Sequence, residues 1–159
     1  MEISRVLMKG RTLQGVWLFP EKLIAVKADS FRAHQLGGYY DLPHGVCNAI
    51  LLPHVQAYNA KAVPERFVDI AQAMGVETRD MGSSEAAEAA LKAIRNLSAE
   101  VGIPPNLAAF EVIKPDDFAA LSDNAKLDAC GATNPHQPTK DEVVALYSAA
   151  NQGHAERVE

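Results

Sequence analysis

From residue 43 onwards, apolar residues recur at the spacing of amphipathic helices, and helix-ending residues bound each run. The segment that begins with Pro64 is followed by Gly75, and these are the residues expected at the first helical position and just past the end. Its apolar stripe consists of Phe67, Ile70, Ala71 and Met74. The same reasoning predicts helices over residues 45–59, 64–74, 84–101, 115–131 and 139–150.

Three of these helices have further features. The helix over 45–59 is apolar on nearly all sides, which is typical of a buried central helix. The last helix begins at Thr139, and Glu142 three residues later completes the pattern of a capping box. The helix over 84–101 is expected to bury one face, made of Ala87, Leu91, Ile94, Leu97 and Val101.

The first 32 residues have a different pattern. Two short runs that contain β-branched or aromatic residues, 16–19 and 23–26, flank residues 20–22 and can form two strands joined by a turn. A helical or disordered state remains open for them, because an isolated hairpin is marginal in water. The expected fold class is therefore all-α, a helical array preceded by a divergent segment of possible short strands. We expect a segment at 1–32, a helical domain at 33–150 and a polar tail at 151–159.

Charge divides the chain at the same place. Residues 1–32 hold six basic and three acidic residues, whereas residues 33–159 hold nine basic and seventeen acidic ones, which gives the overall net charge of −5. The mild acidity argues against a nucleic-acid partner. A change of charge at one point favours two segments with different roles.

Length and composition bound the class of protein. With 159 residues, 48% hydrophobic and 22% charged, the sequence is that of one globular domain. The longest apolar runs, such as Ala49–Leu52, are far too short for a membrane span, and Met1–Lys9 does not resemble a signal peptide. Two cysteines are too few for a disulfide scaffold, which favours a reduced, cytoplasmic setting.

Three histidines are spaced by ten residues, at His34, His44 and His54. His44 lies between a proline and a glycine at the start of an apolar helix, which suits a metal ligand or a proton carrier, although it can equally be a simple helix lead-in. His34 taken alone is expected to be a loop histidine, because a ten-residue spacing fits no short metal motif. His54 is expected to be a structural histidine. The Gly37-Gly38 pair indicates a sharp turn or a close backbone approach.

The two cysteines have different expected environments. Cys47 is expected to be a core residue of the helix over 45–59. Cys130 closes the helix over 115–131, where the negative end of the helix dipole disfavours a thiolate. If Cys130 has a function, it acts as an apolar wall.

A longer pattern carries a resemblance to a known family. The segment His34-Gln-Leu-Gly-Gly-Tyr-Tyr-Asp-Leu-Pro-His44-Gly-Val-Cys-Asn-Ala-Ile-Leu-Leu-Pro-His54-Val resembles the signature of the iron-containing (group III) alcohol dehydrogenases, nearest to the 1,3-propanediol dehydrogenase and lactaldehyde reductase type. Further segments resemble the same family in the same order: 65–67, 73–76, 101–104 and 128–135.

The resemblance implies a C-terminal all-helical domain, a small alcohol or aldehyde substrate, NAD, and Fe²⁺ or Zn²⁺ in a cleft beside a nucleotide-binding domain. His44 matches a metal ligand of the family. His34 matches a histidine beside the site in the proton path, which is the expected catalytic role. Cys130 matches a cysteine near the nicotinamide, hence a cofactor-binding residue. The resemblance is also compatible with a homo-oligomer.

Departures from the family limit what the chain is expected to do alone. The nucleotide-binding domain is missing, and with it an Asp and a His ligand, while Ser30 stands where a further His ligand is expected. Only His44 remains of four ligands, and metal sites of this kind use three or four. We therefore expect a partial dehydrogenase chain that is inactive alone. The alternatives, in order, are a non-catalytic helical module that binds itself or a partner, and a weak metal-binding protein that uses His34, His44 and Asp41.

Overall fold

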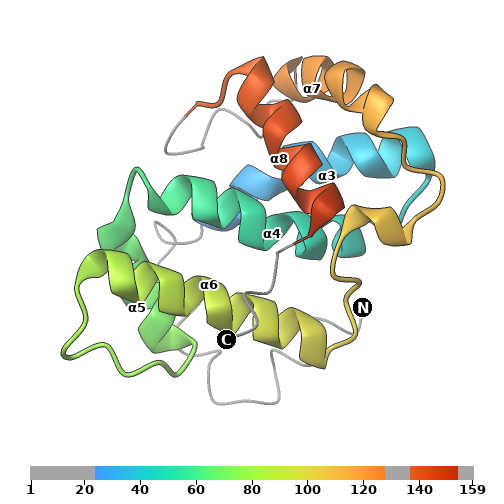
Figure 1. The fold of residues 1–159 in the computed structure, drawn as a ribbon. Helices are drawn as coiled ribbons and strands as arrows, with labels where there is room; N and C mark the ends of the chain where they lie inside the picture. Colours follow the sequence, from blue (N-terminus) through green and yellow to red (C-terminus); the bar gives the residue numbers. More distant parts are fainter. Residues whose placement is uncertain (1–23, 128–136, 154–159) are drawn as a thin grey trace.

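The computed structural model describes residues 24–127 and 137–153, and in these ranges the ordered elements are all helical (Figure 1). The all-α fold class is thereby confirmed. The elements in chain order are α3 (Ile24–Tyr40), α4 (His44–Ala60), α5 (Pro64–Ala73), α6 (Ser83–Glu100), the short 3-10 helices η1 (Leu107–Ala109) and η2 (Pro115–Asp117), α7 (Phe118–Leu127) and α8 (Lys140–Gln152).

The strand interpretation of residues 23–26 is wrong for the part that the structure describes, since α3 begins at Ile24. No glycine or proline interrupts residues 24–36, and a short apolar run can belong to a helix as well as to a strand. The other expected strand, 16–19, lies outside the described residues.

Helix α3 also corrects the interpretation of the Gly37-Gly38 pair, because both glycines lie inside it. The expected sharp turn comes only after Tyr40, where Asp41 adopts a positive φ of 55°. The close approach is present at Gly37: a Cβ at this residue would lie 3.3 Å from the backbone oxygen of Leu42. Two glycines weaken a helix, so α3 depends on packing against its neighbours more than on local propensity.

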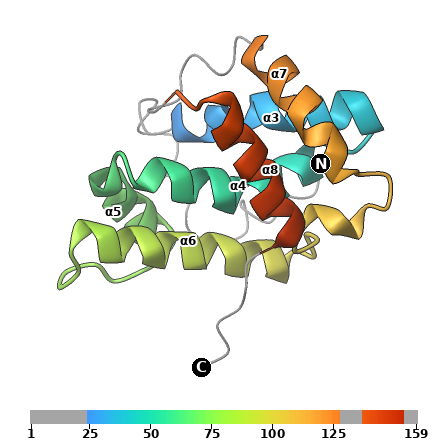
Figure 2. The same ribbon diagram turned by 45° about the horizontal axis from the view of Figure 1, so that its top comes forward.

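Helix α4 is central, as its sequence predicts. It packs against α3, α5, α6 and α8, and its buried residues point to several sides. In Figures 1 and 2, α3 and α4 run side by side, with α8 crossing them and α6 on the other side of α4. The helix continues through Pro53 to Ala60 without interruption.

The buried residues form two clusters. The large cluster joins α3, α4, α7 and α8, with Leu107 of η1 and the nearby Ile113. Its buried members are Ala33, Leu36, Cys47, Ile50, Leu51, Val55, Leu107, Ile113, Phe118, Leu121, Ala125, Val143, Leu146, Tyr147 and Ala150. The small cluster joins α5 to α6 and consists of Phe67, Ala71, Ala87, Ala90 and Leu91.

Helix boundaries follow the predicted signals closely. Pro64 begins α5, and Gly75 has a φ of +86° just beyond its end. The capping box of α8 is confirmed: the Thr139 hydroxyl accepts from the Glu142 backbone N–H at 3.3 Å, and the Glu142 carboxylate accepts from the Thr139 N–H at 2.7 Å. Before α7, Pro115–Asp117 forms a 3-10 turn, so the α-helix begins later than predicted.

The buried face of α6 is shorter than the sequence suggests. Ala87 and Leu91 are buried as expected, but Ile94, Leu97 and Val101 are only half-buried. Helix α5 has ten residues against eighteen in α6, so it can cover only part of the longer helix. None of the helices in residues 24–127 and 137–153 is both long and apolar enough to cross a membrane.

Candidate functional site

The structure brings His34 and His44 together. His34 lies on α3 and His44 is the first residue of α4, and their rings stack with centroids 4.7 Å apart and planes 22° apart. Both residues are exposed. The expectation that His34 is a loop histidine is therefore wrong, because α3 extends through it. A ten-residue spacing gave no sign of this contact.

Packing beneath the two rings fixes the elements that carry them. Leu36 of α3 and Cys47, Ile50 and Leu51 of α4 are at most 3% exposed and belong to the large cluster. Residues 41–43 connect the two helices, at the right-hand side of Figure 1. The two imidazoles thus project from a rigid antiparallel helix pair.

The backbone also holds His44 in place at the start of α4. The carbonyl of Pro43 accepts hydrogen bonds from the N–H groups of Val46 and Cys47, at 3.0 and 3.1 Å. These bonds close the first turn of the helix directly after proline, whose ring restricts the backbone of this connection.

Asn48 is a site residue that the sequence reasoning missed. Its Nδ2 lies 2.8 Å from Nε2 of His44, while its Oδ1 is buried with no hydrogen-bond partner. With the amide nitrogen at this position, the contact requires a lone pair on Nε2, because an amide N–H only donates. The signal that could have found it is the i, i+4 spacing, which places two residues on one face of a helix.

A second contact joins the end of α3 to the 3-10 helix η2, which precedes α7. The Tyr40 hydroxyl donates to the Asp117 carboxylate at 2.7 Å and accepts from the Lys114 N–H at 3.2 Å. Burial raises the pKa of Tyr40, and the adjacent Asp117 carboxylate raises it further. The hydroxyl is thereby kept as a donor, and the end of α3 stays in position next to His44.

The remaining candidate residues divide between core and undescribed segments. Cys47 is a free, fully buried cysteine, and burial raises the pKa of its thiol, in keeping with an unreactive core residue. His54 is 7% exposed, as expected of a structural histidine. Cys130, the predicted cofactor-binding residue, lies outside the described residues, as does His136.

The donors around His44 do not fit a catalytic iron or zinc site. Within residues 24–127 and 137–153, no group of three or more His, Cys, Asp or Glu side chains could hold a metal ion. Metal sites of this class use at least three protein ligands, and the described part of the site offers two imidazoles. No catalytic step through a metal follows from this arrangement.

Comparison with known proteins gives a consistent result. Residues 30–151 match the model of the Fe-containing alcohol dehydrogenase family, C-terminal. Lactaldehyde reductase from Escherichia coli (strain K12) is 47% identical over 118 residues, which cover 74% of this chain and 31% of the relative. The 1,3-propanediol dehydrogenase of Citrobacter freundii is 46% identical over 118 residues, covering 74% of this chain and 30% of the relative.

A solved structure agrees in fold. Alcohol dehydrogenase from Oenococcus oeni superimposes with a TM-score of 0.74 at 43% identity, covering 77% of this chain and 32% of that chain. The chain thus spans about a third or less of the length of the proteins that it matches.

Proposed function

Because the chain belongs to the Fe-containing alcohol dehydrogenase family, we propose that it is the C-terminal helical part of a metal- and NAD-dependent alcohol dehydrogenase with little activity alone. The substrates of the complete enzyme are small primary alcohols or diols and the matching aldehydes. The observation that carries this proposal is the match of residues 30–151 to the C-terminal part of the family. The names of the two relatives support the substrate class.

The roles of individual residues follow from the resemblance. His44 is the metal ligand that this chain contributes, His34 the histidine of the proton path, and Cys130 a wall of the nicotinamide site. When fully ligated, the metal of the family polarises the alcohol oxygen. The stacking of His34 on His44 supports placing both residues in one site.

We also propose that residues 33–150 are the folded unit, with residues 1–32 as a separate segment and 151–159 as a tail. Helix α3 runs through residue 32 without a break, so the division lies within a helix. The proposed location is the cytoplasm, because two cysteines suit a reducing compartment.

A dehydrogenase assay tests the proposal. The purified chain is incubated with NAD, propane-1,3-diol and either Fe²⁺ or Zn²⁺, and the formation of NADH is followed by absorbance. The 1,3-propanediol dehydrogenase of Citrobacter freundii serves as the positive control. We expect no NADH above background from this chain. Robust turnover that disappears in a His44→Ala variant would show that the chain is a sufficient enzyme.

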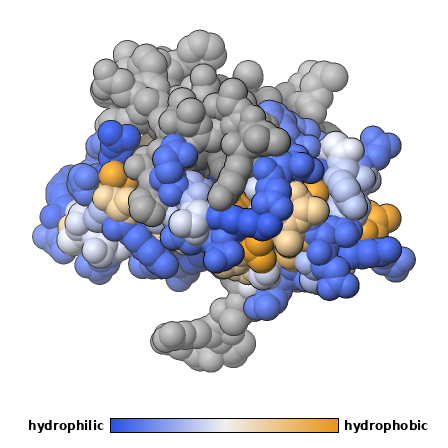
Figure 3. Space-filling view, turned by 90° about the horizontal axis from the view of Figure 1, so that it is seen from above, coloured by the Kyte–Doolittle hydropathy of each residue, from blue (hydrophilic) through white to orange (hydrophobic). Residues whose placement is uncertain are grey.

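A second candidate function is a helical module that binds a copy of itself. Tyr39 and Val112 are the large hydrophobic residues that stay exposed among those described, at 56% and 52%. In Figure 3, hydrophobic residues occur as small groups among hydrophilic ones on the coloured part of the face, which favours weak contacts. Light scattering across a concentration series tests this function, and a constant monomer mass would contradict it.

A further inference from the structure

We propose that two copies of this chain associate through a junction patch, a surface made of four exposed residues: Tyr39, Glu111, Val112 and Lys114. The inference rests on the second candidate function, in which the chain binds a copy of itself, and it adds the location and symmetry of the contact. It is independent of the dehydrogenase proposal, because it requires neither NAD nor a metal.

The large hydrophobic side chains that stay exposed among the described residues lie on two neighbouring segments. Tyr39 is 56% exposed near the end of α3, and Val112 is 52% exposed in the loop between η1 and η2. The Tyr40 hydroxyl joins these segments, because it accepts from the Lys114 N–H at 3.2 Å. Tyr40 also contacts Tyr39, with ring centroids 4.9 Å apart. In Figures 1 and 2, the end of α3 and this loop lie side by side, and apolar side chains exposed together mark an interaction surface.

The local backbone does not explain an exposed valine at position 112. The Phe110 carbonyl accepts from the Ile113 N–H at 3.0 Å, so Val112 is a central residue of a tight turn. Central positions of turns favour Gly, Asn, Asp, Ser and Pro, whereas valine is a β-branched residue suited to packed surfaces. Ile113 is 8% exposed and belongs to the large cluster, while its neighbour Val112 stays outside it. The valine therefore suits a contact with another molecule better than it suits the turn.

Opposite charges flank this valine. Glu111 and Lys114 are both exposed, and neither side chain forms an ion pair within residues 24–127 and 137–153. If a two-fold axis passes through the turn at Val112, Glu111 of each copy faces Lys114 of the other. The contact then contains two equivalent ion pairs around a contact between the two valines, as a closed symmetric dimer requires.

This self-complementarity selects a second copy as the partner. One charge of each sign beside an apolar residue matches its own image after a two-fold rotation. A nucleic acid would require a basic surface, whereas the chain has a net charge of −5. The same net charge, together with the exposed Asp116 near the patch, opposes the approach of two copies. We therefore expect a weak dimer, with a dissociation constant of roughly 0.1–1 mM.

Sedimentation velocity of the full chain at concentrations up to about 1 mM measures the association. The wild type is expected to form more dimer as its concentration rises. Glu111→Lys and Lys114→Glu each place like charges opposite one another at both ion-pair positions, so each variant should weaken the dimer by about tenfold. Val112→Ser removes the central apolar contact and should weaken the dimer by at least about threefold.

An equimolar mixture of the Glu111→Lys and Lys114→Glu variants tests the two-fold pairing directly. In a mixed dimer, opposite charges face each other at both positions, so the mixture should dimerise about as strongly as the wild type although neither variant does so alone. Glu88→Lys is the matched control, because it makes the same change of charge at an exposed residue of α6. This control should not weaken the dimer.

The outcomes separate this inference from the proposals on which it rests. A monomer at every concentration would overturn both the junction patch and the second candidate function. Association that is unchanged in Val112→Ser and in both charge variants would overturn the junction patch alone, and a mixture that fails to dimerise would overturn the two-fold pairing. Circular dichroism confirms that each variant remains helical. A negative dehydrogenase assay leaves the inference intact.

Discussion

The helix pair α5–α6 and the helix pair α3–α4 reach their packing by different routes. Four of the five buried residues in the small cluster between α5 and α6 are alanine or leucine, and Phe67 is its one aromatic member. The apolar stripe of α5 and its flanking Pro64 and Gly75 are visible in the sequence. Helix α3, by contrast, contains two adjacent glycines, and α4 is apolar on nearly all sides.

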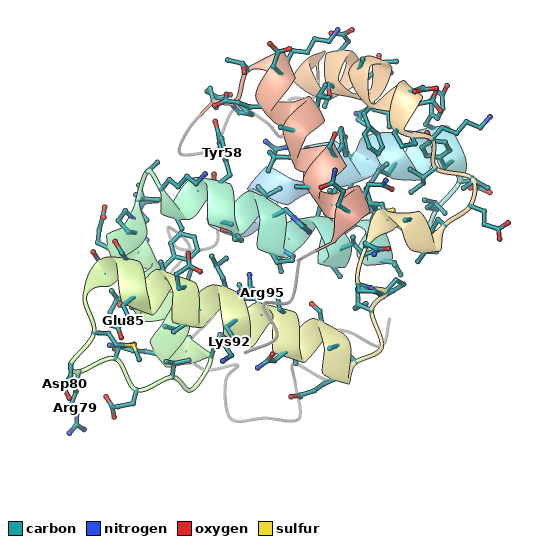
Figure 4. The ribbon with its side chains drawn as sticks, in the orientation of Figure 1. Tyr58, Arg79, Asp80, Glu85, Lys92 and Arg95 are labelled. Carbon is teal, nitrogen blue, oxygen red and sulfur yellow. The ribbon has the colours of Figure 1, made fainter. Side chains whose placement is uncertain are left out.

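The difference shows where a functional site can be placed. The outer loop between α5 and α6 carries charged residues that point into solvent, among them Arg79 and Asp80 (Figure 4), and Arg79 pairs with Glu77 within the loop. The pair α3–α4 instead presents two histidines on a surface supported by the large cluster. A site gains precision from buried support, which the larger of the two cores provides.

The largest expected effect compares one phenylalanine from each cluster. Phe118 is 2% exposed and stacks on Tyr147 with centroids 5.5 Å apart, whereas Phe67 is 1% exposed among small residues. Phe118→Ala is expected to lower the free energy of unfolding by about 3–5 kcal/mol. Phe67→Ala should cost about 1 kcal/mol less, because no aromatic pair is lost.

Urea denaturation followed by circular dichroism measures both changes. Each variant must remain folded at zero urea for the comparison to hold, which the helical signal reports. A loss in Phe67→Ala equal to or larger than that in Phe118→Ala would show that the aromatic pair is not what distinguishes the large cluster.

A smaller effect concerns the buried hydroxyl of Tyr147, which donates to the backbone oxygen of Arg32 at 2.9 Å and so joins α8 to α3. At pH 8, Tyr147→Phe is expected to cost about 0.5–1.5 kcal/mol. Burial raises the pKa of Tyr147 in the folded state above the value near 10 of an unfolded chain. The tyrosine therefore stabilises the fold below pH 10, and this contribution declines as the pH rises above 10.

The measurement is the free energy of unfolding at pH 8 and at pH 10.5–11. The free energy of unfolding of the wild type should fall more steeply over this range than that of Tyr147→Phe. The difference in stability between the two proteins therefore becomes smaller. Thr139→Ala is the matched control, because it removes the cap of α8 at a cost of about 1 kcal/mol without removing a tyrosine. The difference in free energy of unfolding between this variant and the wild type should be the same at both pH values. Parallel declines in all three proteins would contradict the assignment.

The smallest effect distinguishes the two glycines of α3. A Cβ at Gly38 meets nothing within 4 Å, so Gly38→Ala is expected to stabilise the protein by about 0.5–1 kcal/mol through helix propensity. A Cβ at Gly37 would lie 3.3 Å from the oxygen of Leu42, which must move to admit it. Gly37→Ala should therefore gain less than Gly38→Ala, or lose stability.

Thermal melts of the two variants measure this pair. If Gly37→Ala proves the more stable, the approach of Leu42 to α3 does not constrain the turn before His44. If Gly38→Ala lowers the melting temperature, the helical conformation of α3 at Gly38 is contradicted.

The parts of the fold that could be predicted from the sequence are those that depend on residues close together in the chain. Pro64 and Gly75 set the limits of α5, and the Thr139–Glu142 box begins α8, because capping depends on residues three or four positions apart. Helix α3 escaped prediction because the Gly37-Gly38 pair is a turn signal when read locally. Its helical state depends on packing against α4, which follows it directly, and against α7, which is distant in sequence.

For the candidate site, the motif around His44 was sufficient to select this histidine and to suggest His34. Their stacking could not be predicted from the sequence, because two residues ten positions apart meet only if the chain reverses direction between them. Asp41 lies in that reversal and adopts a positive φ. The contact between Asn48 and His44 was also not predicted, although the two residues are four positions apart in the sequence.

The sequence by itself determined the helical class, the limits of the capped helices and the family, since periodicity, caps and a long motif are all written locally in the chain. Only the tertiary structure decided that α3 is a helix, that the ring of His34 stacks on that of His44, and that Arg32 is fully buried with its backbone oxygen bonded to Tyr147. The physical reason is that these features depend on free energy gained between distant segments. Burial of the large cluster outweighs two helical glycines and a buried arginine, and no pattern in the local sequence records that balance.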